Sequence, residues 1–143
     1  MEFDVQRCRD GVHVLYHDDH VLDGGRPVPV AGLTFPEFRR LADTHLLLAE
    51  ALEVLRERKK AHLDLKSRPG GDGVRWPGDD VALVEEVIEA LGAENVIVTT
   101  LEDESVRAVR AWSRSRYPDL LVGLSLGRDV RGHGLWRLSL IHI

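Results

Sequence analysis

The sequence is poor in the features that define the more specialised classes of protein. Its single cysteine, Cys8, excludes an internal disulfide and is more simply explained as a small buried hydrophobe. No apolar run approaches the roughly 18–20 residues that a membrane-spanning helix needs. Positive charge is scarce, because 24 Asp and Glu outnumber 19 Lys and Arg, and the net charge of −5 argues against nucleic-acid binding.

The residues that are present fit one globular domain with a parallel sheet. A hydrophobic content of 43% and a charged content of 30% are ordinary, and 143 residues can bury a real core. Strand-like segments recur with one helix between them, which is the rhythm of a parallel α/β fold. We expect strands over residues 61–66, 96–100 and 120–125, and helices over 34–41, 47–59, 79–91 and 103–117.

Residues 2–18 are the first stretch with chemical potential. Asp10-Gly11 lies between two apolar runs, which favours a hairpin with a two-residue turn. This turn would place Asp4 opposite His17, with Glu2 on the same face as Asp4 because side chains alternate along a strand. Two carboxylates and one imidazole would then meet. The simpler alternative is that Glu-x-Asp marks the solvated face of a strand and that His-Asp is a surface pair.

The expected strand at residues 61–66 adds a third carboxylate. Leu63 and Leu65 alternate with Asp64 and Lys66, so the two apolar side chains face one way and the two charged ones the other. In an isolated antiparallel sheet the charged pair would face water. In a parallel barrel it would point inward near the carboxyl ends of the strands, where a charged pair needs partners or a function.

Taken in order, these segments resemble the glycerophosphodiester phosphodiesterase family. That family has a Glu-x-Asp-Val strand, a Thr-x-Asp-Gly type turn, a run ending in His-Asp, a Thr-Leu-x-Glu-x-Leu type helix start and an acidic-x-Lys strand. The matching segments here are Glu2–Val5, Arg7–Gly11, Val14–Asp18, Leu48–Leu52 and Asp64–Lys66. The resemblance implies an α/β fold, an incomplete TIM barrel of the phospholipase C-like phosphodiesterase type with roughly strands 2 to 6.

The resemblance also implies a site and a reaction. Glu2, Asp4 and Asp64 would hold a divalent cation, and all-oxygen ligation suits Mg²⁺ or Ca²⁺. Lys66 would bind the phosphate and His17 would act as acid or base. The substrate would be a small-molecule phosphodiester whose glycerol hydroxyl attacks phosphorus. Water would open the cyclic intermediate, giving glycerol 3-phosphate and an alcohol. The third acidic residue of the family is commonly Glu, whereas here it is Asp64.

The length of the chain suggests a fragment of such an enzyme. A TIM barrel takes about 250 residues, so we expect a partial phosphodiesterase domain over residues 1–137, without the first and last strands. We interpret residues 138–143 as a non-native tail. In the family, two histidines share the acid–base catalysis. His17 corresponds to one of them, and the other lies on the first strand, which we expect these 143 residues not to include. We therefore expect the 143 residues by themselves to be inactive or nearly so.

Two other interpretations stay open. The chain could be a non-catalytic α/β binding or structural module that only echoes the motifs, with Glu2, Asp4 and Asp64 as surface carboxylates. It could also be another phosphodiesterase related to the phospholipases C or D. The mutual positions of the three carboxylates discriminate the first alternative from a metal-dependent enzyme.

Overall fold

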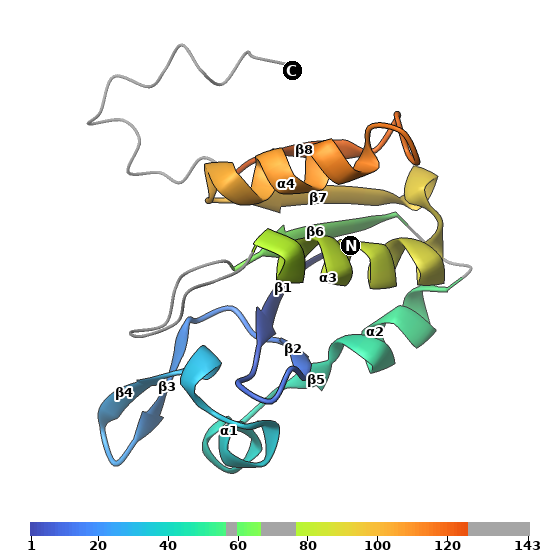
Figure 1. Cartoon of the computed structure of the whole chain (residues 1–143). Coiled ribbons are helices and arrows are strands. Elements are labelled where there is room, and N and C mark those ends of the chain that lie inside the picture. Colours follow the sequence, from blue (N-terminus) through green and yellow to red (C-terminus); the bar gives the residue numbers. More distant parts are fainter. Residues whose placement is uncertain (57–59, 67–76, 126–143) are drawn as a thin grey trace.

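The computed structural model describes residues 1–56, 60–66 and 77–125, which form an α/β fold (Figure 1). The expected tail at residues 138–143 lies outside these ranges. The elements in chain order are β1 (Glu2–Arg7), β2 (His13–Leu15), β3 (His20–Asp23), β4 (Arg26–Pro29), η1 (Val30–Gly32), α1 (Phe35–Leu41), β5 (Leu46–Leu47), α2 (Leu48–Leu55), β6 (Ala61–Leu65), α3 (Pro77–Leu91), η2 (Ala93–Asn95), β7 (Val96–Thr100), α4 (Asp103–Ser113) and β8 (Leu121–Leu124).

The main sheet has the strand order β5-β2-β1-β6-β7-β8. Strands β1, β6, β7 and β8 run parallel, each beside the next, while β2 and β5 extend the sheet antiparallel beyond β1. Within the described residues the sheet stays open, with β8 at its edge. The fold is therefore that of an incomplete TIM barrel, and the expected alternation of strands and helices is confirmed.

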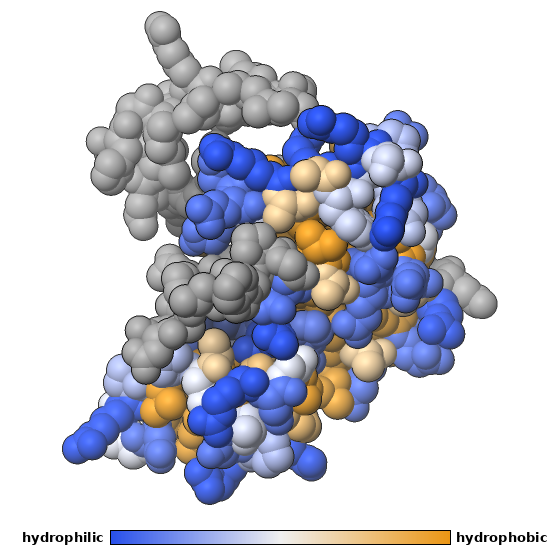
Figure 2. Space-filling view, viewed as in Figure 1, coloured by the Kyte–Doolittle hydropathy of each residue, from blue (hydrophilic) through white to orange (hydrophobic). Residues whose placement is uncertain are grey.

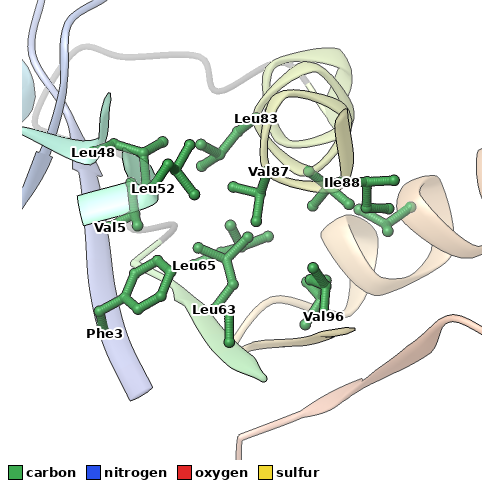
Figure 3. Close-up of a cluster of buried hydrophobic side chains, with 14 of the residues drawn as sticks. Phe3, Val5, Leu48, Leu52, Leu63, Leu65, Leu83, Val87, Ile88 and Val96 are labelled. Atoms are coloured by element: carbon green, nitrogen blue, oxygen red, sulfur yellow. The ribbon is translucent and has the colours of Figure 1, made fainter. Parts of the chain in front are cut away.

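The larger core lies between the parallel strands and the helices α2, α3 and α4. Leu63 and Leu65 of β6 are almost fully buried and point toward Val87 of α3 (Figure 3). The alternation predicted for this strand is thus confirmed on its apolar side. Viewed from the helix side, most of the surface is hydrophilic, and apolar side chains show between the elements (Figure 2). Among the described helices, none is both long and apolar enough to cross a membrane.

A second, smaller core lies under the β3–β4 unit and α1. Val14, Val21 and Phe38 are buried there, and Tyr16 packs edge-on against Phe38 with ring centroids 5.3 Å apart. Helix α1 begins as its sequence predicts, because Glu37 accepts hydrogen bonds from both the backbone N–H and the hydroxyl of Thr34. This small core fixes the segment between β2 and β4 against the sheet.

The predicted two-residue turn of the first hairpin is wrong. Strand β1 pairs with β2 so that Val5 lies opposite Leu15, and the Cys8 N–H donates to the Val12 carbonyl across a three-residue loop. Gly11 has a φ of 89° at the end of this loop, as in a type I turn followed by a bulge. The longer loop shifts the register by one residue. A shift by one changes which residues face each other.

Two helices are shorter than their patterns predict. Helix α2 ends at Leu55 and α4 at Ser113, whereas apolar spacing favoured continuation to about residues 59 and 117. At α4 the chain leaves the helix in turns, in which the N–H groups of Arg116 and Tyr117 both donate to the Ser113 carbonyl. Helix α3 begins at Pro77, two residues before the predicted start at residue 79, so Asp79 and Asp80 lie in its first turn.

The burial of Cys8 leads to a first prediction. Its side chain is 1% exposed, and burial, with a smaller contribution from the charge of Asp10, raises the pKa of the thiol to about 11. Because the thiolate is the reactive form, Cys8 should resist iodoacetamide at pH 8 in the folded protein. It should alkylate at the rate of a free thiol in 6 M guanidinium chloride. Mass spectrometry measures both rates, and equal rates would contradict the buried position.

Candidate active site at the carboxyl ends of the parallel strands

The face of the sheet opposite α2, α3 and α4 carries a row of polar residues. Asp4 of β1 is in register with Asp64 of β6, Asp64 with Thr99 of β7, and Thr99 with Gly123 of β8. Neighbouring residues in register on parallel strands point to the same face. Carboxylates from strands that are 60 residues apart in the sequence therefore lie side by side, as expected for Asp4 and Asp64.

Lys66 follows β6 and places its ammonium between the two carboxylates. Its Nζ lies 2.9 Å from Asp4 Oδ1 and 2.8 Å from Asp64 Oδ2. The side chains are partly enclosed, with exposed fractions of 23% for Lys66, 20% for Asp4 and 9% for Asp64, so water screens them less than a surface ion pair. Burial alone would lower the pKa of Lys66, but hydrogen bonds to Asp64 and Asp4 outweigh it and raise the pKa.

Asp64 is the carboxylate of the site that accepts hydrogen bonds from three side chains. Its Oδ1 accepts hydrogen bonds from the hydroxyls of Thr99 and Ser125, each at 2.8 Å, while Oδ2 meets Lys66. Burial would raise the pKa of Asp64, but the hydrogen bonds from Lys66, Ser125 and Thr99 outweigh that effect and lower it. Asp64 is therefore held as a charged carboxylate in one fixed orientation.

Glu2 lies on β1 two residues before Asp4. It is in register with His62 of β6, two residues before Asp64, and its side chain is exposed. His62 Nε2 lies 2.8 Å from Thr99 Oγ1, which in turn donates to Asp64. Over the ranges that the structure describes, no three His, Cys, Asp or Glu side chains form a group that could hold one metal ion. The structure thus joins Asp4 and Asp64 through Lys66, and it leaves Glu2 outside this contact.

The register of the hairpin also places His17 differently from its predicted position. The N–H of Tyr16, not of His17, donates to the carbonyl of Asp4. His17 instead follows β2 with its side chain 79% exposed, and its Nδ1 lies 2.8 Å from Asp18 Oδ1. The convergence of Asp4 with His17 as directly opposed residues is therefore wrong, because the loop has three residues and not two.

His17 and Lys66 nevertheless face a common space. A cavity of about 220 Å³ opens beside the carboxylate cluster, and its lining residues are Gln6, His17, Asp18, Asp19, His20, Lys66 and Leu101. The cavity lies where β1, β6 and β7 end, which is where TIM barrels place their chemistry. An anionic group in this space would have a lysine ammonium and an imidazole as neighbours.

Several residues of this site have roles that the sequence did not reveal. Thr99 and Ser125 were expected at strand ends, but not as hydrogen-bond donors to one carboxylate. Gln6 is 6% exposed, and its Nε2 donates to the Asp18 carbonyl at 2.6 Å, which ties the His-Asp segment to β1. The only signal for Gln6 was that it shares the face of Asp4, two residues away.

The fold is that of an incomplete α/β barrel with polar residues gathered at the carboxyl ends of its parallel strands, and comparison with known proteins identifies the family. A sequence model described as the glycerophosphoryl diester phosphodiesterase family matches residues 1–121. The chain therefore belongs to that family, whose members are phosphodiesterases. No curated protein sequence matches the chain.

Solved structures give the same fold. A glycerophosphodiester phosphodiesterase from Parabacteroides distasonis matches with a TM-score of 0.67 and 16% identity, covering 96% of this chain and 64% of its own. A putative one from Silicibacter pomeroyi has a TM-score of 0.65, 22% identity and coverages of 85% and 52%. A glycerophosphodiester phosphodiesterase from Thermotoga maritima has a TM-score of 0.59 and 20% identity, and the match covers 92% of this chain and 50% of its own. The chain thus spans between half and about two thirds of these structures.

The lowered pKa of Asp64 leads to a second prediction. Because the folded pKa lies below the unfolded value of about 3.9, the ionised carboxylate stabilises the fold above that pH, and this contribution is lost as pH falls through the folded pKa. Asp64→Asn should therefore lower the free energy of unfolding by about 1–3 kcal/mol at pH 7. The difference from the unmodified chain should shrink below about pH 4.

Urea unfolding from pH 3 to 8 measures this difference. Asp23→Asn is the matched control, because Asp23 is an exposed aspartate on β3 that does not line the cavity. A loss of stability that stays the same at every pH would show that the charge of Asp64 is not what stabilises the fold.

Proposed function

We propose that the protein is a metal-dependent glycerophosphodiester phosphodiesterase, which converts glycerophosphodiesters to glycerol 3-phosphate and an alcohol. The observation that carries the proposal is the Asp4–Lys66–Asp64 cluster at the edge of a cavity that His17 also lines. Phosphodiester hydrolysis needs a neutralised phosphate, an activated nucleophile and a protonated leaving group. Lys66 and a cation held by Asp4 and Asp64 would neutralise the phosphate. His17 would transfer the protons of the nucleophile and the leaving group.

Asp4 and Asp64 fit a divalent cation by their chemistry. Both present carboxylate oxygens to one common point, which the ammonium of Lys66 occupies in the structure. Oxygen donors of this kind suit Mg²⁺ or Ca²⁺, and Glu2 lies on the same face of β1 as a third carboxylate. A bound cation would supply positive charge against the phosphate oxygens. Lys66 would then be released to contact the substrate phosphate directly.

His17 is suited to proton transfer. Its Nδ1 is engaged by the carboxylate of Asp18, which leaves Nε2 as the atom that can accept or donate a proton. In the proposed reaction His17 Nε2 accepts the proton of the attacking hydroxyl or returns one to a leaving oxygen. The hydrogen bond from Gln6 to the Asp18 carbonyl holds this segment in place.

The cation site gives a third prediction. Mg²⁺ or Ca²⁺ at millimolar concentration should raise the melting temperature of the chain, since a ligand that binds only the folded state stabilises it. Asp4→Asn and Asp64→Asn should each abolish that rise, whereas Asp43→Asn, an exposed aspartate after α1, should keep it. Differential scanning fluorimetry with and without EDTA measures the shift. An equal rise in all variants would indicate nonspecific binding and contradict the site.

The role of His17 gives a fourth prediction. With glycerophosphocholine and Mg²⁺ we expect the 143 residues by themselves to turn over slowly, and His17→Ala should lower that rate by on the order of 10²-fold or more. Release of glycerol 3-phosphate, followed by a coupled dehydrogenase, measures the rate. Cation binding at Asp4 and Asp64 without any turnover, even on long incubation, would favour a non-catalytic binding module.

A further inference from the structure

His62 of β6 lies two residues before Asp64, and its ring contacts the threonine that donates a hydrogen bond to Asp64. We propose that His62 is a positioning residue of the cation site, which fixes the hydroxyl of Thr99 as a hydrogen-bond donor to Asp64. The inference rests on the proposed function, because it concerns the cation that Asp4 and Asp64 would hold. His62 acts on this cation only through Thr99 and does not bind it.

The register of the parallel strands places His62 next to the site. Its side chain points to the same face of β6 as that of Asp64, because the two residues are two positions apart. On β7 the residue in register with His62 is Ile97, and Thr99 lies two positions further along. His62 therefore reaches diagonally to the neighbouring strand, with Nε2 2.8 Å from Thr99 Oγ1. This contact joins one level of the sheet to the next.

The number of protons fixes the direction of both hydrogen bonds at Thr99. The hydroxyl has one hydrogen, and Thr99 Oγ1 donates it to Asp64 Oδ1 at 2.8 Å. Thr99 must then accept the other hydrogen bond, so His62 Nε2 carries a hydrogen and is the donor. The opposite direction would turn a lone pair of the hydroxyl toward a carboxylate that is ion-paired with Lys66 and therefore charged.

The hydrogen bond from His62 affects the orientation of the Asp64 carboxylate. Thr99 and Ser125 both donate to Oδ1, which leaves Oδ2 to face the point that it shares with Asp4. A hydroxyl that accepts a hydrogen bond is polarised by it and becomes a stronger donor. His62 also holds the Thr99 hydroxyl against rotation toward another acceptor. Groups that lie behind metal ligands commonly tune metal affinity in this way.

The simpler alternative is that His62 only fills space on this face of β6. An apolar ring of similar size would then serve equally well, because packing does not depend on a ring nitrogen. The two interpretations differ in what they require of Nε2. His62→Phe keeps a ring and removes the donor, whereas His62→Gln removes the ring and keeps an N–H donor at a similar distance from the backbone.

Titration calorimetry with Mg²⁺ or Ca²⁺ alone tests the role of His62. His62→Phe should lower the affinity for the cation by about 10-fold or more, whereas His62→Gln should keep most of it. His45→Phe is the matched control and should bind normally, because His45 is also partly buried but packs against Phe35 and Phe38 in the smaller core. Equal affinities of His62→Phe and the unmodified chain would overturn the inference and leave the proposed function standing. No binding by the unmodified chain would contradict both.

A double-mutant cycle tests whether His62 acts through Thr99. Thr99→Val removes the hydroxyl and nearly keeps the shape, and it should lower the cation affinity at least as much as His62→Phe does. The variant with both changes should then bind the cation like Thr99→Val alone. Losses of affinity that simply add would show that His62 affects the site by another route, and they would overturn the inference.

The direction of the hydrogen bond can be measured on the unmodified chain, so this test does not require any variant to fold. A proton–nitrogen correlation spectrum of the imidazole rings distinguishes ring nitrogens that carry a hydrogen from those that do not. At about pH 8, His62 Nε2 should carry one, with or without added Mg²⁺. A bare Nε2 would mean that Thr99 donates to His62, and it would overturn the inference whatever the calorimetry shows.

Discussion

The ion pairs of Lys66 with Asp4 and Asp64 are the contact on which the rest of the site depends. Two carboxylates from adjacent strands would repel each other in this partly enclosed position without a cation between them. The parallel register of β1 and β6 brings them together, and that register is set by Phe3, Val5, Leu63 and Leu65, which are buried against the helices. A slip of one residue would turn the charged side chains into the core. The packing of one face of the sheet therefore determines the electrostatics of the other.

This coupling explains why much of the fold could be predicted from the sequence. In β6, Leu63 and Leu65 alternate with charged residues. When helices cover one face of the sheet, the leucines must point toward the helices and the charged side chains away from them, and the structure has this arrangement. The succession of strands and helices from β6 to β8 was likewise readable, because each apolar strand is short and each helix carries an apolar stripe. The pairing of Asp4 with Asp64 follows from the parallel order. These features depend on local patterns that tertiary contacts reinforce.

The first hairpin shows what local patterns could not provide. Asp10-Gly11 suits a two-residue turn, yet the Asp10 carboxylate accepts from the Phe35 N–H at the start of α1, and the Arg9 N–H donates to the Leu33 carbonyl. These contacts, with partners about 25 residues away, hold Arg9 and Asp10 in a three-residue loop and leave Gly11 as the residue with positive φ. The register of β2 and the position of His17 follow from them. Short-range turn preferences could not predict this outcome.

The hydrogen bonds that Asp64 accepts have a structural consequence for the proposed cation. The hydroxyls of Thr99 and Ser125 both donate to Oδ1, which uses the lone pairs of that atom and fixes the carboxylate plane. Oδ2 is then the atom that faces the common point with Asp4, and it is the one that contacts Lys66. A shorter side chain that is held by two hydroxyls has less freedom to follow a cation than a longer one would have. The position of a cation would thus be set by the strands themselves, because Asp64, Thr99 and Ser125 all lie in or directly after them.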